Sequence, residues 1–133
     1  MSGMGAAPSC HEPYVRQAAK AGSWYTSNGT DLRKELEKHL QEARKTPQSP
    51  RDSIRGVLVP HAGYAYSGPT AAYSYHQLEN LPKHVTTIVV LHPSHHHYLS
   101  GCAVSGASHL ETPLGRLEVD IELQSEVLKL PKF

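Results

Sequence analysis

Two short apolar runs, each closed by a proline, constrain the fold of this chain more than any other feature. Residues 54–59 (IRGVLV) lead directly into Pro60, and residues 85–91 (VTTIVVL) are followed by His92 and Pro93. Runs of this length and β-branched content, bounded by proline, are typical of buried strands. Residues 70–78 between them have a helical pattern, so the sequence predicts a βαβ unit with parallel strands and a right-handed crossover.

A second helix is predicted before this unit. Starting at Thr30, a plausible N-cap, apolar side chains recur at helical spacing with charges between them, at Leu32, Leu36, Leu40 and Ala43. This pattern predicts an amphipathic helix of about 14 residues. After the βαβ unit, short strands are predicted at 102–104 and 117–119, and a third helix from Asp120 to about Leu128.

The predicted domain has too few strands and helices for a sheet built from such apolar strands. Residues 1–20 show no apolar period and are expected to form a flexible N-terminal tail. Residues 21–133 then form part of a single α/β domain with a mostly parallel sheet. Near-continuous apolar strands occur in sheets that are covered on both faces, yet only three helices are predicted. We therefore expect an incomplete architecture, from a truncated gene product, a fragment, or a protomer that uses the surface of a partner chain.

The composition excludes several classes of partner. The chain has 133 residues and a formal charge of +1, with 13 Lys and Arg against 12 Asp and Glu, so no basic stripe is present to bind nucleic acid. No run approaches the roughly 18 apolar residues that a membrane span needs. The two cysteines are too few for a disulfide framework. These features, with no signal pattern at the start, place the chain in the cytoplasm.

Histidine is the residue type that points to chemistry. Four of the ten histidines lie within seven residues, at 92, 95, 96 and 97, and His61 follows the other predicted strand. Ligands of open α/β sheets bind at the carboxyl ends of the strands, so His61 and His95 are the first candidates for two ligands of one metal ion. Neutral imidazole suits Zn, Cu and Fe. The alternatives are a solvated polar loop and an adventitious nickel binder.

Other candidate residues can have a structural or a functional role. Trp24 is most simply an anchor that packs the N-terminal segment onto the sheet. Tyr64 and Tyr66 flank the first histidine loop, where a functional and a structural role are equally compatible with the sequence. Cys102 is either a soft third metal ligand or a small buried hydrophobe, of which the second is favoured.

Four motifs carry a family resemblance. AGSWYTSNG, VLVPHAGYAYSG, LHPSHHHYLSGCAVS and ETPLGRLEVD occur in this order, and they resemble the N-terminal part of the Memo family, mediators of ErbB2-driven cell motility. That family is similar in fold to class III extradiol dioxygenases, which are non-haem iron enzymes. The resemblance implies an iron or copper site with His61 and His95 as ligands. It also implies that Trp24 and Tyr66 border the pocket and take part in recognition of phosphotyrosine peptides.

Family members are longer than this chain, and their further His and Cys ligands lie in the part without a counterpart here. The predicted metal pocket is therefore only partly present. Three hypotheses follow: a metal-binding redox or motility-signalling factor, a non-enzymatic adaptor that binds phosphotyrosine peptides of receptors, and a truncated isoform without independent activity. A true dioxygenase is the weakest enzyme reading, because such sites need a carboxylate beside two His and no carboxylate is suitably placed.

Overall fold

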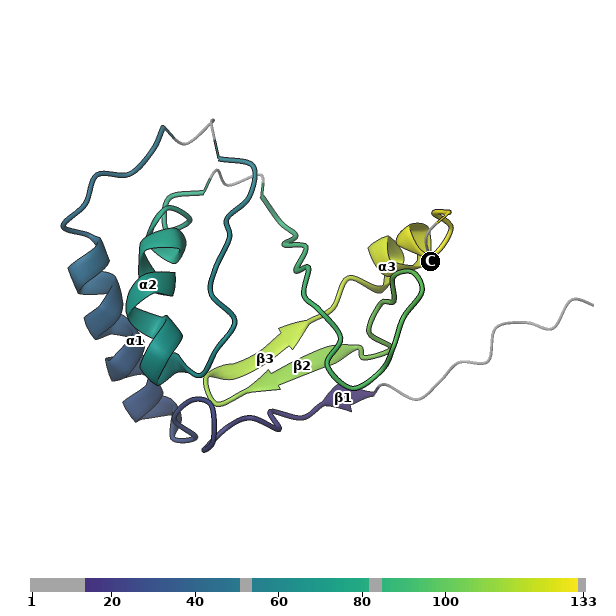
Figure 1. The fold of residues 1–133 in the computed structure, drawn as a ribbon, viewed down its shortest axis with the longest axis horizontal. Coiled ribbons are helices and arrows are strands. Elements are labelled where there is room, and N and C mark those ends of the chain that lie inside the picture. The colour runs from purple at the N-terminus through teal and green to yellow at the C-terminus, as the bar shows by residue number, and fades with distance from the viewer. Residues whose placement is uncertain (1–13, 51–53, 82–84, 132–133) are drawn as a thin grey trace, which may run out of the picture.

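The computed structural model describes residues 14–50, 54–81 and 85–131. These residues form a small mixed α/β fold with three helices and one three-stranded sheet (Figure 1). In chain order the elements are β1 (Val15–Arg16), α1 (Gly29–Ala43), α2 (Tyr64–His76), β2 (His109–Thr112), β3 (Gly115–Glu118) and α3 (Ile121–Val127). The paired helices α1 and α2 lie at one end of the molecule, the sheet runs from them across the middle, and α3 lies at the far end.

Helix α1 confirms the amphipathic pattern but begins one residue earlier than Thr30. Its N-cap is Asn28, whose side chain accepts a hydrogen bond from the backbone N–H of Asp31 at 3.1 Å. The predicted apolar face packs inward, with Leu32 and Ala43 buried. Helix α3 is also as predicted, because the side chain of Asp120 caps it by accepting from a backbone N–H of its first turn.

Helix α2 starts well before the predicted residue 70 and contains Pro69 in its second turn. Its first turn is fixed from outside the helix, because the backbone N–H of Tyr64 donates to the carbonyl of Trp24 at 2.7 Å. The hydroxyl of Ser67, which is buried, donates to the carbonyl of Ala62 at 2.9 Å. These bonds satisfy helix-terminal groups and favour the longer helix, although Pro69 removes one hydrogen bond within it.

A polar cluster joins the ends of α1 and α2. Arg44 donates from Nε to Glu79 at 2.9 and 3.1 Å and also pairs with Glu37. The buried ring of His76 lies with Nδ1 2.7 Å from a carboxylate oxygen of Glu79 and Nε2 3.2 Å from the carbonyl oxygen of Thr46. The cluster therefore ties the chain that leaves α1 to the last turn of α2.

The charge cluster gives stability a pH dependence. Hydrogen bonds from Arg44, and then from His76, lower the pKa of Glu79. The carboxylate therefore stabilises the fold above the pKa it has in the unfolded chain, about 4.3, and this stabilisation is lost as pH falls through the lower folded pKa. We expect Glu79→Gln to have a lower urea midpoint than the unaltered chain at pH 7, and the two midpoints to converge as the pH falls through the lowered pKa of Glu79. A difference that stays constant over this range would contradict this role.

The sheet differs from the predicted one in order and direction. β1 pairs in parallel with β2, and β2 pairs antiparallel with β3. The β2–β3 turn closes at Gly115, whose φ of +134° is in the region that favours glycine, and Thr112 Oγ1 donates to the Gly115 carbonyl at 2.7 Å. The predicted tail is wrong for residues 15 and 16, because β2 offers them a ladder partner. Residues 1–13 of that tail lie outside the described residues.

The predicted βαβ unit is not formed. Among the described residues, neither 54–59 nor 85–91 is part of a strand, and the apolar side chains of the second run are exposed from Ile88 to Leu91. Likewise, 102–104 forms no strand, whereas the strand predicted at 117–119 overlaps β3. The physical reason is that a strand exists only when its backbone pairs with a neighbouring strand, and no described segment forms a ladder with either run. The carbonyl of Leu58 in the first run accepts instead from the hydroxyl of Ser74 at 2.9 Å.

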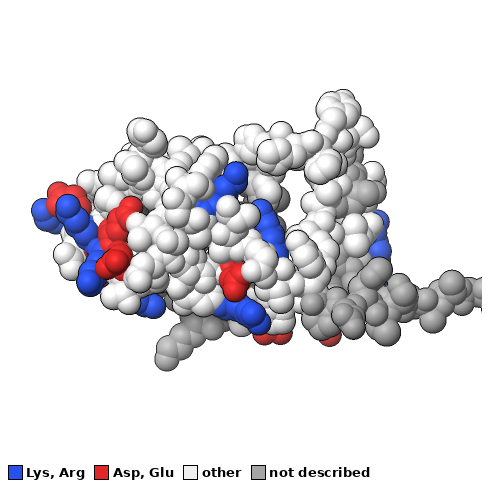
Figure 2. Space-filling view, turned by 90° about the horizontal axis from the view of Figure 1, so that it is seen from below, with Lys and Arg blue, Asp and Glu red and all other residues white. Residues whose placement is uncertain are grey.

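The hydrophobic core is correspondingly small. Among the described residues the buried apolar side chains are Leu32, Ala43, Ala72 and Ala107, and none of the large apolar side chains is fully buried. Charged side chains gather at the end of the molecule that α1 forms (Figure 2). In the part of the chain that the structure describes, no helix has the length and apolar character to cross a membrane.

Candidate metal centre

His61 and His95 meet across the two histidine loops. Their Nε2 atoms are 3.0 Å apart, and the ring planes are within 6° of parallel with centroids 5.1 Å apart. The distance between the ring centroids exceeds the distance between the Nε2 atoms by about two ångström. The Nε2 edges of the two rings therefore face each other. In this pair one Nε2 donates its hydrogen and the other accepts it. The two residues singled out in the sequence are therefore in contact, although the strands expected to position them are not formed.

A third ligand is not found beside this pair. Among residues 14–50, 54–81 and 85–131, no group of three or more His, Cys, Asp or Glu side chains is arranged to hold a metal ion. His92 turns its Nδ1 to the carbonyl of Pro93 at 3.0 Å. Cys102 is exposed, so the expectation of a buried residue is wrong, because no strand forms there to cover it.

The loop of the second histidine motif is closed by Ser94. Its hydroxyl donates to the carbonyl of His97 at 2.7 Å, and the N–H of His97 lies 3.2 Å from the same oxygen. This turn leaves the rings of His95, His96 and His97 exposed. Of these three, His95 alone has a described contact with His61.

Trp24 lies directly against the histidine pair. Its ring centroid is 5.7 Å from that of His61, with the planes tilted by 58°, and the ammonium of Lys20 lies 5.4 Å from the Trp24 ring centroid. The backbone of Trp24 packs on the turn before α2, where a Cβ at Gly63 would lie 3.2 Å from the Trp24 carbonyl oxygen. Trp24 is thus an anchor for the N-terminal segment and a neighbour of the pair. Sequence reasoning missed Lys20, whose signal is its i, i+4 spacing from Trp24.

The two tyrosines of this region differ in their surroundings. Tyr64 packs against Tyr25 with ring centroids 5.2 Å apart, and burial raises the pKa of its hydroxyl. Tyr66 is 86% exposed, and its side chain has no hydrogen bond or ring contact within the described part of the chain. The structure therefore does not join Tyr66 to Trp24, the other residue expected to bind peptides.

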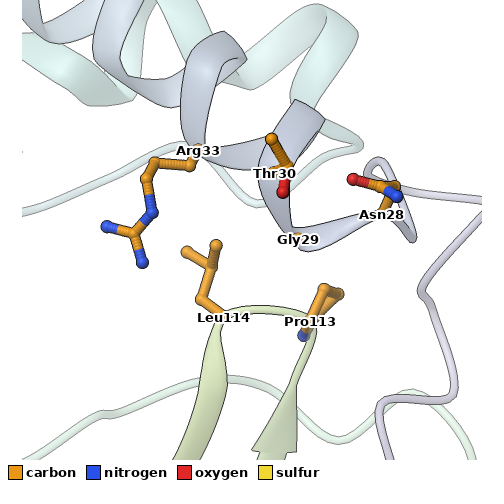
Figure 3. A pocket seen from close by; sticks show the side chains of 6 residues that line it. All are labelled: Asn28, Gly29, Thr30, Arg33, Pro113 and Leu114. Carbon is orange, nitrogen blue, oxygen red and sulfur yellow. The ribbon is translucent and has the colours of Figure 1, made fainter.

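A separate pocket of about 340 Å³ lies between the start of α1 and the β2–β3 turn (Figure 3). Its lining comes from two parts of the chain, Asn28, Gly29, Thr30 and Arg33 on one side and Pro113 and Leu114 on the other. No His, Cys, Asp or Glu lines it, so this pocket is distinct from the histidine pair.

The family is decided by comparison with known proteins. The family model described as Memo-like protein matches residues 16–133. The chain belongs to the Memo-like family. It is 44% identical over 110 residues to MEMO1 family protein MHO1 of Saccharomyces cerevisiae, covering 82% of this chain and 32% of that protein. It is 40% identical over 118 residues to Protein MEMO1 of Homo sapiens, covering 89% of this chain and 38% of that protein.

The match has a limited extent in the relatives. Protein memo-1 homolog of Caenorhabditis elegans is 41% identical over 115 residues, which are 86% of this chain and 31% of the worm protein. The chain therefore spans about a third of the length of the curated relatives that it matches. The residues of this chain that match the family model include both histidine loops and Trp24.

Proposed function

We propose that this Memo-family chain contributes His61 and His95 as two ligands of an iron or copper site in a cytoplasmic redox or motility-signalling protein. The observation that carries the proposal is the 3.0 Å separation of the two Nε2 atoms. Two imidazole nitrogens that bind one ion at about 2.0–2.1 Å lie about 3.0–3.4 Å apart. The pair therefore fits two adjacent positions around a single ion after a small rotation of the rings.

The chain's own residues supply two of the required donors. The described residues offer no third donor at this place, so the remaining ligands come from polypeptide or solvent beyond them. A bound iron or copper ion would supply one-electron and oxygen chemistry of the kind found in non-haem metal enzymes. The ring of Trp24 lies against that of His61, and Ser94 holds the loop that presents His95. These residues position the imidazoles whether or not catalysis takes place.

Metal titration tests the proposal. We expect about one equivalent of Fe(II) or Cu(I) to bind the purified chain under anaerobic conditions, with affinity at least tenfold lower in His61→Ala and in His95→Ala. Both side chains are exposed, so their loss leaves the core intact. His97→Ala is the matched control, because it removes an exposed imidazole of the same loop. Absence of binding, or equal binding by all variants, would contradict the proposal.

Trp24 offers a second readout that does not depend on activity. It is the single tryptophan of the chain and its ring lies 5.7 Å from His61. Copper(II) at the His61–His95 pair is expected to quench more than half of the tryptophan fluorescence, since paramagnetic quenching is efficient at contact distance. His97→Ala should keep this quenching and His61→Ala should lose it. Quenching that survives in His61→Ala would place the copper elsewhere.

A second candidate function is recognition of a phosphotyrosine peptide. The favouring observation is the ammonium of Lys20 beside the Trp24 ring, because an aromatic face and a cation together complement a phosphorylated ring. We expect a fluorescent phosphotyrosine peptide to bind more weakly to Trp24→Ala, in the presence or absence of a metal chelator, while its unphosphorylated form does not bind. Equal binding of both peptides would argue against this function.

A further inference from the structure

Three residues with a side-chain hydroxyl precede a proline in this chain, namely Thr46, Ser49 and Thr112. A proline disfavours the helical conformation of the residue before it and so keeps that residue extended. The proline itself has no backbone N–H. A proline-directed protein kinase accepts an extended substrate with a proline directly after the hydroxyl residue. The sequence therefore contains three candidate phosphorylation sites of one class.

The structure commits two of these hydroxyls to the fold. The hydroxyl of Thr46 donates to the carbonyl of Ala43 at 2.7 Å, and the backbone N–H of Thr46 donates to the same carbonyl at 3.0 Å. The Thr46 carbonyl also lies 3.2 Å from Nε2 of the buried His76 ring. Thr112 is part of β2, and its hydroxyl donates to the carbonyl of Gly115 at 2.7 Å. Neither residue can enter a kinase without breaking these bonds.

Ser49 is held through its backbone instead. Its N–H donates to the side-chain oxygen of Gln77 at 2.7 Å, and the side chain of Gln48 donates to the carbonyl of His76 at 2.6 Å. The end of α2 therefore fixes the position of this loop. Ser49 is exposed, and its hydroxyl has no hydrogen bond with any residue of the described ranges. The loop thus presents the hydroxyl of Ser49 to solvent without using it.

An arginine lies in the same hollow as Ser49. This hollow of about 350 Å³ is lined by Ser49, Gln77 and residues 54–57, and Arg55 is the only charged residue among the described residues that line it. Arg55 is exposed and has no ion pair or hydrogen bond within the part of the chain that the structure describes. A phosphate on Ser49 would carry about two negative charges into this hollow. A guanidinium binds phosphate with two parallel hydrogen bonds, so Arg55 is suited to receive it.

We propose that Ser49 is a phosphorylation site for a proline-directed protein kinase and that its phosphate pairs with Arg55. In the transfer, Ser49 Oγ forms a bond to the γ-phosphorus of ATP, the bond from that phosphorus to the β–γ bridging oxygen breaks, and ADP leaves. The hydroxyl proton passes to the catalytic carboxylate of the kinase. The phosphate then ties the loop after α1 to the segment that leads to His61, and no residue of the histidine pair takes part.

Phosphorylation of the full chain tests the site. The chain is incubated with Mg²⁺, ATP and a mitogen-activated protein kinase, which is proline-directed, and its peptides are analysed by mass spectrometry. We expect about one phosphate per chain, on Ser49, with at least tenfold less on Thr46 and on Thr112. Absence of phosphate from Ser49, or equal phosphate on Ser49 and Thr46, would overturn the proposal.

The double variant Thr46→Ser, Ser49→Ala is the matched control. It keeps one serine before a proline in the same loop, but the hydroxyl at position 46 can still donate to the carbonyl of Ala43. We expect it to incorporate at least tenfold less phosphate than the unaltered chain. Equal incorporation would mean that the kinase reads the sequence of the loop and that the contacts of Thr46 do not protect it, which would overturn the selection of Ser49.

Arg55→Gln tests the pairing of the phosphate. The second ionisation of a phosphoserine has its midpoint near pH 6, and a neighbouring guanidinium favours the doubly charged form. We expect phosphorus NMR of the phosphorylated chain to give a midpoint about 0.5 pH units lower in the unaltered chain than in Arg55→Gln. Lys129→Gln, which removes an exposed positive charge just after α3, should leave the midpoint unchanged. Equal midpoints in Arg55→Gln and the unaltered chain would overturn the pairing with Arg55.

Discussion

Gly29→Ala is expected to lower the free energy of unfolding by about 2–3 kcal/mol. A Cβ at this position would lie 2.2 Å from the carbonyl oxygen of Pro113, which is backbone and cannot turn aside. Alanine is otherwise a better helix residue than glycine, so the loss measures the close approach of α1 to the β2–β3 turn. To relieve the clash, the helix and the hairpin must separate at the pocket seen in Figure 3. Urea denaturation followed by circular dichroism measures the change.

Gly56→Ala is the matched control for this prediction. A Cβ there meets nothing within 4 Å, and the residue has no positive φ. We expect its stability to change by less than about 1 kcal/mol, and in the stabilising direction, because alanine has less freedom in the unfolded chain. Equal destabilisation by both substitutions would mean that the contact between Gly29 and Pro113 does not hold the helix to the hairpin.

The helices were predictable because their signals are local. The buried face of α1 repeats within the helix itself, and Asp120 caps α3 from the adjacent position. The start of α2 was not predictable in this way. It depends on the Trp24 carbonyl, forty residues earlier, which accepts from the N–H of Tyr64. The helical pattern of residues 70–78 contains no trace of this distant contact.

The strands were predicted poorly because strand formation depends on distant partners. β1 was read as tail, yet Val15 pairs with His109 far along the chain. Conversely, residues 85–91 have every local feature of a strand and remain unpaired in the described structure. The composition of a segment therefore indicates whether it can form a strand beside a partner strand. Whether that partner strand is present depends on the fold of the whole chain.

The contact between His61 and His95 was predicted from the sequence, although the βαβ unit expected to produce it is not formed. His61 and His95 were chosen because they follow two apolar runs that were expected to be parallel strands with their carboxyl ends at one edge of a sheet. They are in contact even though the runs form no ladder, because the turn before α2 is fixed to Trp24 and Ser94 closes the other loop. The loops, rather than the strands, bring the imidazoles together. The contacts of Lys20 with Trp24 and of Tyr64 with Tyr25 depend on this packing, and of the two only Lys20 has a local signal, its i, i+4 spacing from Trp24.

His76→Ala is expected to lower the free energy of unfolding by about 2–3 kcal/mol. The ring is buried and connects the carboxylate of Glu79 with the carbonyl of Thr46, so its loss leaves a cavity and removes the ring's contacts with both groups. The end of α1 and the end of α2 would then be held together through Arg44 alone among the contacts of this cluster. Urea denaturation followed by circular dichroism again measures the change.

His96→Ala separates this effect from the general loss of an imidazole. His96 is exposed, and its ring has no hydrogen bond with the described residues, so its replacement should change stability by less than about 0.5 kcal/mol. His76→Gln retains one amide that reaches an acceptor and should lie between the two. If His76→Ala and His96→Ala were equally stable, the His76 ring would not hold the junction of α1 and α2, where Arg44 also binds Glu79 and the side chain of Gln48 donates to the carbonyl of His76.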